Sequence, residues 1–155
     1  MKRFSSVLII FFLFTACRTQ HVHKTETANE YTHAAVISAH PLASQVGVDI
    51  LQKGGNAVDA AIAVKFALAV VYPNAGNIGG GGFLVYRSKD GEKAALDFRE
   101  KAPGLADQDM YLDSAGNPIT RLSLDGHLSS GVPGTVAGMQ EAYKKYGTLA
   151  WEELL

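Results

Sequence analysis

The residues best suited to chemistry lie in one charged segment, Asp97-Phe98-Arg99-Glu100-Lys101. It comes where a predicted strand ends and a loop begins, a place from which rigid elements commonly present side chains to a ligand. An arginine there can clamp a carboxylate through two parallel hydrogen bonds, because the guanidinium is a planar fork. The alternative is an arginine that is solvated or paired locally, as most arginines at strand ends are. The residue types alone favour that alternative.

A run of four glycines, Gly79 to Gly82, is the second feature with chemical potential. It lacks the Gly-Lys-Ser/Thr ending of a phosphate loop, and its Gly-x-Gly-x-x-Gly spacing breaks at Leu84. The order of elements is also reversed, because a predicted helix precedes the glycines and a predicted strand follows them. We therefore expect the glycines to let the backbone pack closely against another element. The alternative is that they let the backbone approach a ligand.

Nucleophiles and metal ligands are not evident in the sequence. The five histidines show no metal-ligand spacing, and the single cysteine, Cys17, belongs to the export signal described below. Helix capping accounts for Ser129, Ser130 and Thr135, which stand at a loop-to-helix entry. We therefore predict no catalytic residue, no metal and no cofactor in this chain. A net charge of −1 without a basic stripe also argues against nucleic-acid binding.

The first sixteen residues read as a secretory signal. Lys2 and Arg3 precede a short apolar run, and small residues lead to Cys17. The run is about half of the roughly 20 residues that a membrane-spanning helix needs. Ala16 before Cys17 suits a bacterial lipobox, in which the thiol is diacylated and two acyl chains anchor the protein. The alternative is an ordinary signal peptide with an incidental cysteine.

The rest of the chain divides into a tether and one modest domain. Residues 17–33 are polar and predict a flexible tether, and residues 34–155 carry the apolar patterns of a folded domain. Residues 34–38 predict a strand. Pro41 starts a predicted helix over 42–53, with an apolar stripe at Leu42, Val46, Ile50 and Leu51, and Gly54 ends it.

Residues 57–72 are almost wholly apolar and predict a core helix that is buried on all sides, capped by Asn56 with Asp59 in its first turn. A hairpin follows, with strands at 83–87 and 93–99 joined by the Asp90-Gly91 turn. Residues 102–125 are irregular, with a short helix near 107–112. A helix over 135–146 ends at Gly147, and another begins at Trp151. Only one turn of this last helix is present, and one helical turn is not stable alone. We therefore expect the 155 residues to be the front part of a longer protein.

Five motifs in this order resemble the γ-glutamyltransferase family, also called γ-glutamyltranspeptidases or glutathione hydrolases. They are residues 40–44, 54–61, 76–83, 97–103 and 131–135. The resemblance runs from about Ala34 to the last residue and points to the N-terminal part of the family's large subunit.

The resemblance implies an α+β fold, the four-layer αββα sandwich of N-terminal-nucleophile hydrolases, incomplete in this chain. It also implies a precursor that cuts itself into a large and a small subunit. The threonine freed at the start of the small subunit attacks a γ-glutamyl amide such as glutathione, with its own α-amine as base. Water, an amino acid or a dipeptide then takes the γ-glutamyl group. Arg99 matches the large-subunit arginine that holds the substrate's α-carboxylate, whereas the nucleophilic threonine is expected downstream.

Two other functions stay open beside this one. A related acylase of the same superfamily would use the same fold on a different acyl group, although Arg99 favours a substrate with an α-carboxylate. A truncated and inactive lipoprotein is the other alternative. For the enzyme, the signal and Cys17 predict export to the bacterial periplasm or outer membrane, with a lipid anchor at Cys17.

Overall fold

The computed structural model describes residues 31–155. The chain divides into two compact units, Met1–Thr32 and His33–Leu155, and the fold described below is that of the second. The predicted signal peptide, Cys17 and most of the predicted tether lie outside the described residues. Within the described part of the chain, no helix is both long enough and apolar enough to cross a membrane.

The first two helices of the unit begin and end as their capping residues predict. Helix α2 (Pro41–Gln52) has proline in its first turn and an N-cap at His40, whose side chain accepts a hydrogen bond from the Leu42 backbone. Gly54 then takes a positive φ of 93°, which favours glycine. Helix α3 (Ala57–Val71) begins with a capping box, in which Asn56 and Asp59 each accept a backbone hydrogen bond from the other.

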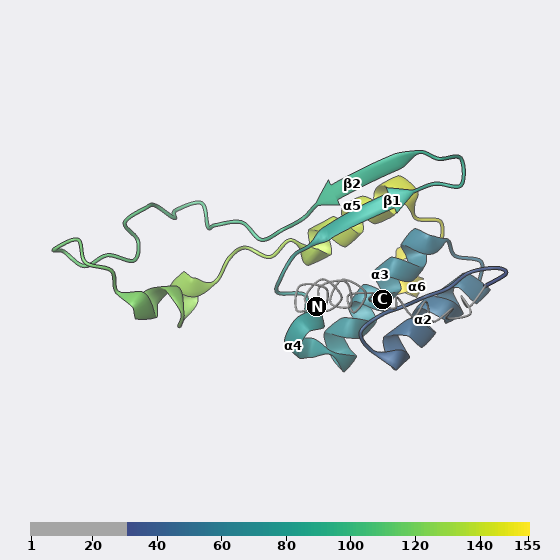
Figure 1. The fold of residues 1–155 in the computed structure, drawn as a ribbon, viewed down its shortest axis with the longest axis horizontal. Helices are drawn as coiled ribbons and strands as arrows, with labels where there is room; N and C mark the ends of the chain where they lie inside the picture. Colours follow the sequence, from purple (N-terminus) through teal and green to yellow (C-terminus); the bar gives the residue numbers. More distant parts are fainter. Residues whose placement is uncertain (1–30) are drawn as a thin grey trace, which may run out of the picture. The chain divides into compact units, whose positions relative to one another are not determined.

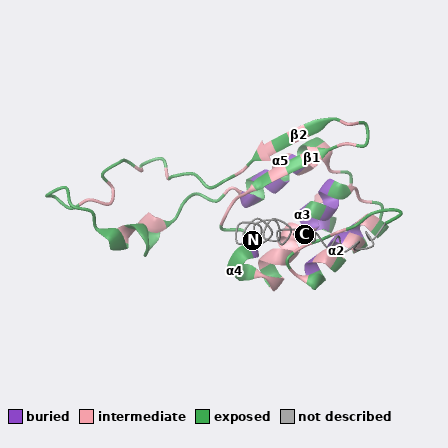
Figure 2. Cartoon of the chain, viewed as in Figure 1, coloured by how far each residue is buried: buried purple, intermediate pink, exposed green. Residues whose placement is uncertain are grey.

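The buried faces of these two helices differ from the prediction. In α2 the buried residues are Ala43, Gly47 and Ile50, whereas Leu42 is exposed. In α3 the buried residues cluster in the first half of the helix, and Val70 near its end is 78% exposed (Figure 2). The prediction of burial on all sides is wrong for the described residues, because they supply packing partners mainly for the first half of α3.

A two-stranded antiparallel hairpin follows the glycine run. Strand β1 (Phe83–Arg87) pairs with β2 (Lys93–Asp97), so that Phe83 faces Asp97 and Arg87 faces Lys93. Gly91 has a φ of 89° in the connecting turn, as the Asp-Gly signal predicts. The second strand ends at Asp97 and not at the predicted 99, although Phe98 still exchanges two backbone hydrogen bonds with Gly82.

One face of the hairpin packs on the helices and the other is exposed. Leu84, Tyr86 and Leu96 contribute to the core, and the ring of Tyr86 stacks on Tyr146 of helix α5 (Thr135–Tyr146) with centroids 4.3 Å apart. Figure 1 shows α5 lying alongside the two strands. On the opposite face Phe83 and Val85 are exposed. Because a two-stranded sheet is marginal alone, the contact with α5 is what stabilises it here.

The short helices complete the unit. Helix α4 (Pro73–Gly76) follows α3, and helix α6 (Trp151–Leu154) follows α5. The Trp151 ring meets Phe66 edge-on at 5.9 Å and Tyr143 at 5.1 Å, so α6 is held against both α3 and α5. Gly147 ends α5 in an extended conformation, so its role there is not that of a left-handed cap.

Two local predictions are wrong. Residues 34–38 form no strand, because the described residues include no neighbouring strand for them; instead Val36 packs where α2 and α3 meet, at Gly47 and Val64. No helix forms near 107–112. There the Asp107 side chain accepts a hydrogen bond from the Asp109 backbone, which favours a turn over a helix.

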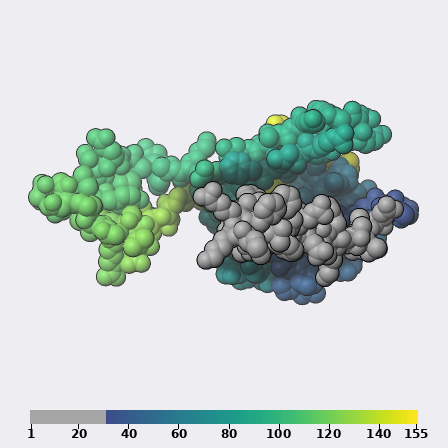
Figure 3. All heavy atoms as spheres, in the orientation of Figure 1, coloured from purple at the N-terminus to yellow at the C-terminus, as the bar shows by residue number. Residues whose placement is uncertain are grey.

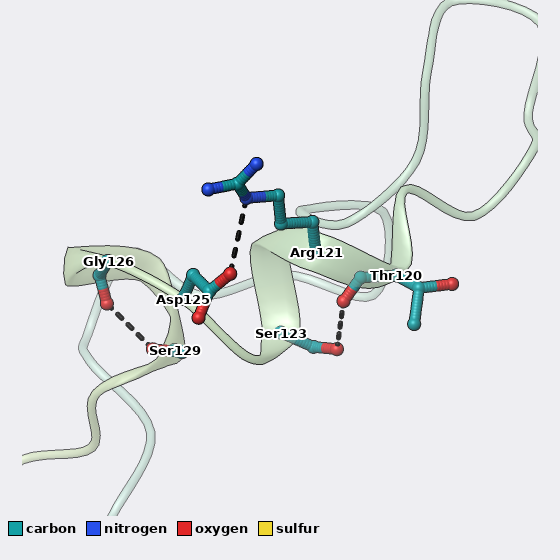
Figure 4. Close-up of polar contacts among 6 residues, drawn as sticks. All are labelled: Thr120, Arg121, Ser123, Asp125, Gly126 and Ser129. Carbon is teal, nitrogen blue, oxygen red and sulfur yellow. Dashed lines mark hydrogen bonds and ion pairs between the residues drawn. The ribbon is translucent and has the colours of Figure 1, made fainter.

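The segment between residues 102 and 131 leaves the hairpin and returns to α5. A bridge between Lys101 and Val132 closes its base. It contains two short 3₁₀ helices, η1 (Thr120–Ser123) and η2 (His127–Ser129), which contact each other (Figure 1). In Figure 3 the atoms of this segment are the green spheres at the left of the view. Local bonds hold them: Arg121 pairs with Asp125 at 3.2 Å, Ser123 donates to the Thr120 carbonyl and Ser129 to the Gly126 carbonyl (Figure 4).

Candidate functional site

Arg99 lies just after the end of β2, at the position that the sequence predicts. Its backbone N–H donates to the side chain of Asp97 at 3.0 Å, which fixes the direction in which the chain leaves the strand. The side chain of Arg99 is exposed. The ion pairs among the described residues are Arg121–Asp125 and Lys145–Glu141, so the Arg99 guanidinium has no carboxylate partner there. The described residues therefore show no local pairing of this arginine, while its exposure agrees both with a solvated side chain and with a clamp for a carboxylate.

Two glycines enclose the backbone that carries Arg99. A Cβ atom on Gly81 would lie 2.5 Å from the Phe98 carbonyl oxygen and 2.7 Å from the Arg99 Cα, closer than real Cβ atoms approach. A Cβ atom on Gly134 would overlap the same carbonyl oxygen from the side of α5. The glycine run and the start of α5 therefore pack against Phe98 and Arg99 from two directions, which confirms the predicted close packing of the glycines.

Backbone hydrogen bonds tie the same three segments together. The carbonyl of Gly80 accepts from the N–H groups of both Gly134 and Thr135, at 2.9 and 3.1 Å. On the other side of Arg99, Lys101 and Val132 exchange two backbone hydrogen bonds of 3.1 and 2.8 Å. Arg99 is thus part of a short loop whose two ends are both fixed, so that its side chain projects from a defined backbone.

A cavity of about 840 Å³ opens beside this loop. Its lining comes from the end of β2, the loop itself and α5, and includes Arg99, Lys101, Gly134 and Glu141. Its volume is in the range of small-molecule sites. The lining also carries the carboxylates of Asp97 and Glu100, and Glu141 is paired with Lys145. The planar guanidinium of Arg99 is the lining group suited to bind a carboxylate through two parallel hydrogen bonds.

The hydroxyl of Thr135 does not cap α5 as predicted. The N-cap position is Gly134, with no side-chain cap, and Thr135 is fully buried with an Oγ1 that has no hydrogen-bond partner among the described residues. Ser129 is bonded to the Gly126 carbonyl, one turn away within the preceding segment. The capping explanation is therefore wrong for Thr135 and Ser129, because the Gly80 carbonyl, and not a side chain, accepts from the backbone N–H groups of Gly134 and Thr135 at the start of α5.

Sequence reasoning missed one neighbour of Arg99. The Arg99 Cζ lies 5.9 Å from the centroid of the Phe83 ring, within the range of a cation–π contact. The sequence could have indicated this neighbour, because Phe83 is the first residue of one strand of the hairpin and lies opposite Asp97, the last residue of the other strand. In the part of the chain that the structure describes, no group of three His, Cys, Asp or Glu side chains is arranged to hold a metal.

Comparisons with known proteins agree on one group. The sequence profile of the family described as Gamma-glutamyltranspeptidase matches residues 43–155. The chain is 60% identical to the glutathione hydrolase proenzyme of Escherichia coli over 114 residues, which are 74% of this chain and 20% of that protein. It is 52% identical to the glutathione hydrolase proenzyme of a Pseudomonas species over 141 residues, 90% of this chain and 24% of that protein.

Solved structures give the same result. The fold is similar to the crystal structure of Helicobacter pylori gamma-glutamyltranspeptidase, with a TM-score of 0.77 and 56% sequence identity, over 81% of this chain and 36% of that chain. The chain thus spans about a fifth to a quarter of the length of the two curated relatives.

Proposed function

Because the chain belongs to the γ-glutamyltranspeptidase family, we propose that it is part of an enzyme that hydrolyses glutathione and transfers its γ-glutamyl group. The fold agrees with that membership: the described helices and strands are part of the α+β, αββα sandwich of N-terminal-nucleophile hydrolases, as predicted. In this proposal residues 34–155 supply the wall of the site that binds the donor, and the nucleophilic threonine comes from a small subunit of the same precursor.

The observation that carries the proposal is the fixed and unpaired Arg99. A glutamyl group bears an α-carboxylate, and a guanidinium that pairs with no carboxylate of residues 31–155 can bind it through two parallel hydrogen bonds. The backbone of Arg99 is enclosed by Gly81 and Gly134, so the donor would be held at a defined distance from the attacking group. The role of Arg99 is therefore to bind and orient the donor, and the acyl transfer itself takes place on groups outside this chain.

A chimaeric precursor tests this role. Residues 43–155 of the chain would replace the matching segment of the E. coli proenzyme, a change that keeps more than half of the residues identical. In the proposed complex the bound donor and the small subunit cover the pair of Arg99 and the α-carboxylate. We therefore expect Arg99→Ala to raise KM for a γ-glutamyl donor at least thirty-fold, since the loss of one member of a buried charge pair costs about 2–5 kcal/mol. Arg99→Lys should also bind poorly, because lysine lacks the planar fork.

Arg87→Ala is the matched control, since this arginine is also exposed on the hairpin but lies at the other end of β1. Self-cleavage of each precursor reports that the variant has folded. Wild-type affinity of Arg99→Ala for the donor would refute the proposed role. The acylase alternative predicts instead that donors with and without an α-carboxylate react equally well, and the inactive-remnant alternative predicts that the chimaera has no activity at all.

We also propose that the protein is exported and anchored by lipid at Cys17. The support is the order of cationic, apolar and small residues before that cysteine. Arg18 follows Cys17 where an aspartate would favour retention in the inner membrane, so the periplasmic face of the outer membrane is the proposed location. Labelling with radioactive palmitate should mark the wild-type chain and not Cys17→Ser. Equal labelling, or none in either, would refute the lipid anchor.

A further inference from the structure

The outer face of the hairpin places three side chains in a row. Phe83 and Asp97 are direct partners in the register of β1 and β2, so their side chains project from the same face of the sheet. Arg99 follows Asp97 by two residues, and its guanidinium carbon lies 5.9 Å from the centroid of the Phe83 ring. The exposed guanidinium of Arg99 therefore lies near the ring of Phe83, a residue of the other strand.

This contact restricts a side chain that would otherwise move freely. An exposed arginine has four rotatable bonds, and ordering it for a ligand costs conformational entropy. The face of an aromatic ring attracts a guanidinium through its quadrupole, without using any of the five N–H donors. A ring contact can thus hold the arginine in place and leave its hydrogen-bonding edge available to a carboxylate.

We infer that Phe83 is a positioning residue, which holds the Arg99 guanidinium ready for the donor's α-carboxylate. The inference rests on the proposed role of Arg99 and adds to it a residue from the other strand. In this inference Phe83 acts only through the Arg99 guanidinium, so its removal should weaken donor binding and leave the rate of the bound complex nearly unchanged. This selective effect on KM is not expected of a purely structural residue.

The test uses the chimaeric precursor with three substitutions at this position. Phe83→Leu removes the ring and keeps an apolar side chain, and we expect it to raise KM for a γ-glutamyl anilide about two- to five-fold, the range of a cation–π contact at an exposed site. Phe83→Tyr and Phe83→Trp keep a ring and should retain the wild-type KM. Val85→Leu is the control, because Val85 is exposed on the same face of the hairpin and has no aromatic ring to offer the guanidinium.

Two further measurements separate this inference from the proposed function. With a 4-aminobutyryl anilide, which lacks the α-carboxylate, Phe83→Leu and wild type should react alike. In a double-mutant cycle, Phe83→Leu should not raise KM for the γ-glutamyl donor any further when Arg99 is already alanine, since both substitutions act through one guanidinium. If Arg99→Ala weakens binding and Phe83→Leu does not, or if the tyrosine and tryptophan variants are as poor as leucine, the inference is wrong. If Arg99→Ala does not change KM for the donor, the proposed role of Arg99 is wrong, and the inference about Phe83 is wrong with it.

Discussion

Asp59 and Thr148 are joined by hydrogen bonds across 89 positions of the sequence. The carboxylate of Asp59 accepts from the Thr148 backbone N–H at 3.0 Å and from the Thr148 hydroxyl at 2.5 Å. It also accepts from the Asn56 backbone at 2.9 Å, and the Asn56 amide donates to the Tyr146 carbonyl at 2.6 Å. Asp59 is fully buried. These hydrogen bonds join the first turn of α3 to the segment between α5 and α6.

This arrangement predicts a stability that depends on the charge of Asp59. Burial alone raises the pKa of Asp59, but hydrogen bonds from Thr148, Asn56 and Leu149 outweigh it and place the pKa below the ordinary value of 3.8. A carboxyl whose pKa is lower in the folded state stabilises the fold above its unfolded pKa. We expect this contribution to be full above about pH 4 and to be lost as the pH falls through the folded pKa.

Asp59→Asn checks this prediction, because it keeps the shape and removes the titrating group. Urea unfolding at pH 7 should show a loss of about 1.5–3 kcal/mol, the contribution of hydrogen bonds to a charged group. The difference between variant and wild type should shrink below pH 4. A difference that stays constant from pH 7 to pH 3 would contradict the role of the charge.

A second prediction concerns Gly81, which contacts the backbone of Arg99. In Gly81→Ala the new methyl group would need the space of the Phe98 carbonyl and the Arg99 Cα, and backbone atoms cannot give way without moving the loop. We expect KM for the γ-glutamyl donor in the chimaera to rise about ten-fold or more, since small displacements of a positioning group are costly. Gly104→Ala is the control, because a Cβ there has no neighbour within 4 Å. Equal KM values for the two variants would show that the close contact does not position Arg99.

The elements that the sequence predicted well are those specified by adjacent residues. Pro41 and Gly54 delimit α2, Asn56 with Asp59 starts α3, and Asp90-Gly91 turns the hairpin, all through interactions within a few positions. The predicted strand at 34–38 failed for the opposite reason, since a strand depends on a partner that no local pattern supplies.

The candidate site was predictable only in part. Resemblance identified Arg99, and the glycine run indicated close packing of backbone. The contacts that hold these residues join segments far apart in the sequence: Gly134 packs on Phe98 next to Arg99, and the Gly80 carbonyl accepts from Gly134 and Thr135. Local propensity contains no signal for such pairs. It assigned Thr135 a capping role, because a hydroxyl at a helix entry is usually a cap and its burial is not visible in sequence.

A third prediction follows from that buried hydroxyl. Thr135→Val replaces Oγ1 by a methyl group of similar size, and a buried polar atom without a partner costs about 1–3 kcal/mol. We expect the variant to be as stable as wild type or more stable by about 1 kcal/mol in urea unfolding. Thr148→Val serves as the contrasting variant, because it removes a hydroxyl that does have a partner and should destabilise. A clear loss of stability in Thr135→Val would mean that Oγ1 is hydrogen-bonded in the folded protein.

A fourth prediction concerns the one lysine inside α3. The Lys65 ammonium donates to the carbonyls of Gly76 and Asn77 at 2.8 and 2.9 Å, and burial lowers its pKa. Asn77 in turn accepts from the Gly79 backbone at 2.8 Å, so the lysine supports the start of the glycine run.

Lys65→Met keeps the apolar stem of that side chain and leaves both carbonyls without their donor. We expect a loss of about 1–3 kcal/mol in urea unfolding. Amide hydrogen exchange at Gly79 and its neighbours should accelerate, because local opening of the run becomes easier. A two- to ten-fold increase in donor KM should accompany it in the chimaera, since Gly81 positions Arg99. Lys89→Met, in the exposed hairpin turn, should change none of these quantities. If exchange at Gly79 is the same in both variants, the glycine run is held by other contacts and Lys65 has no part in the site.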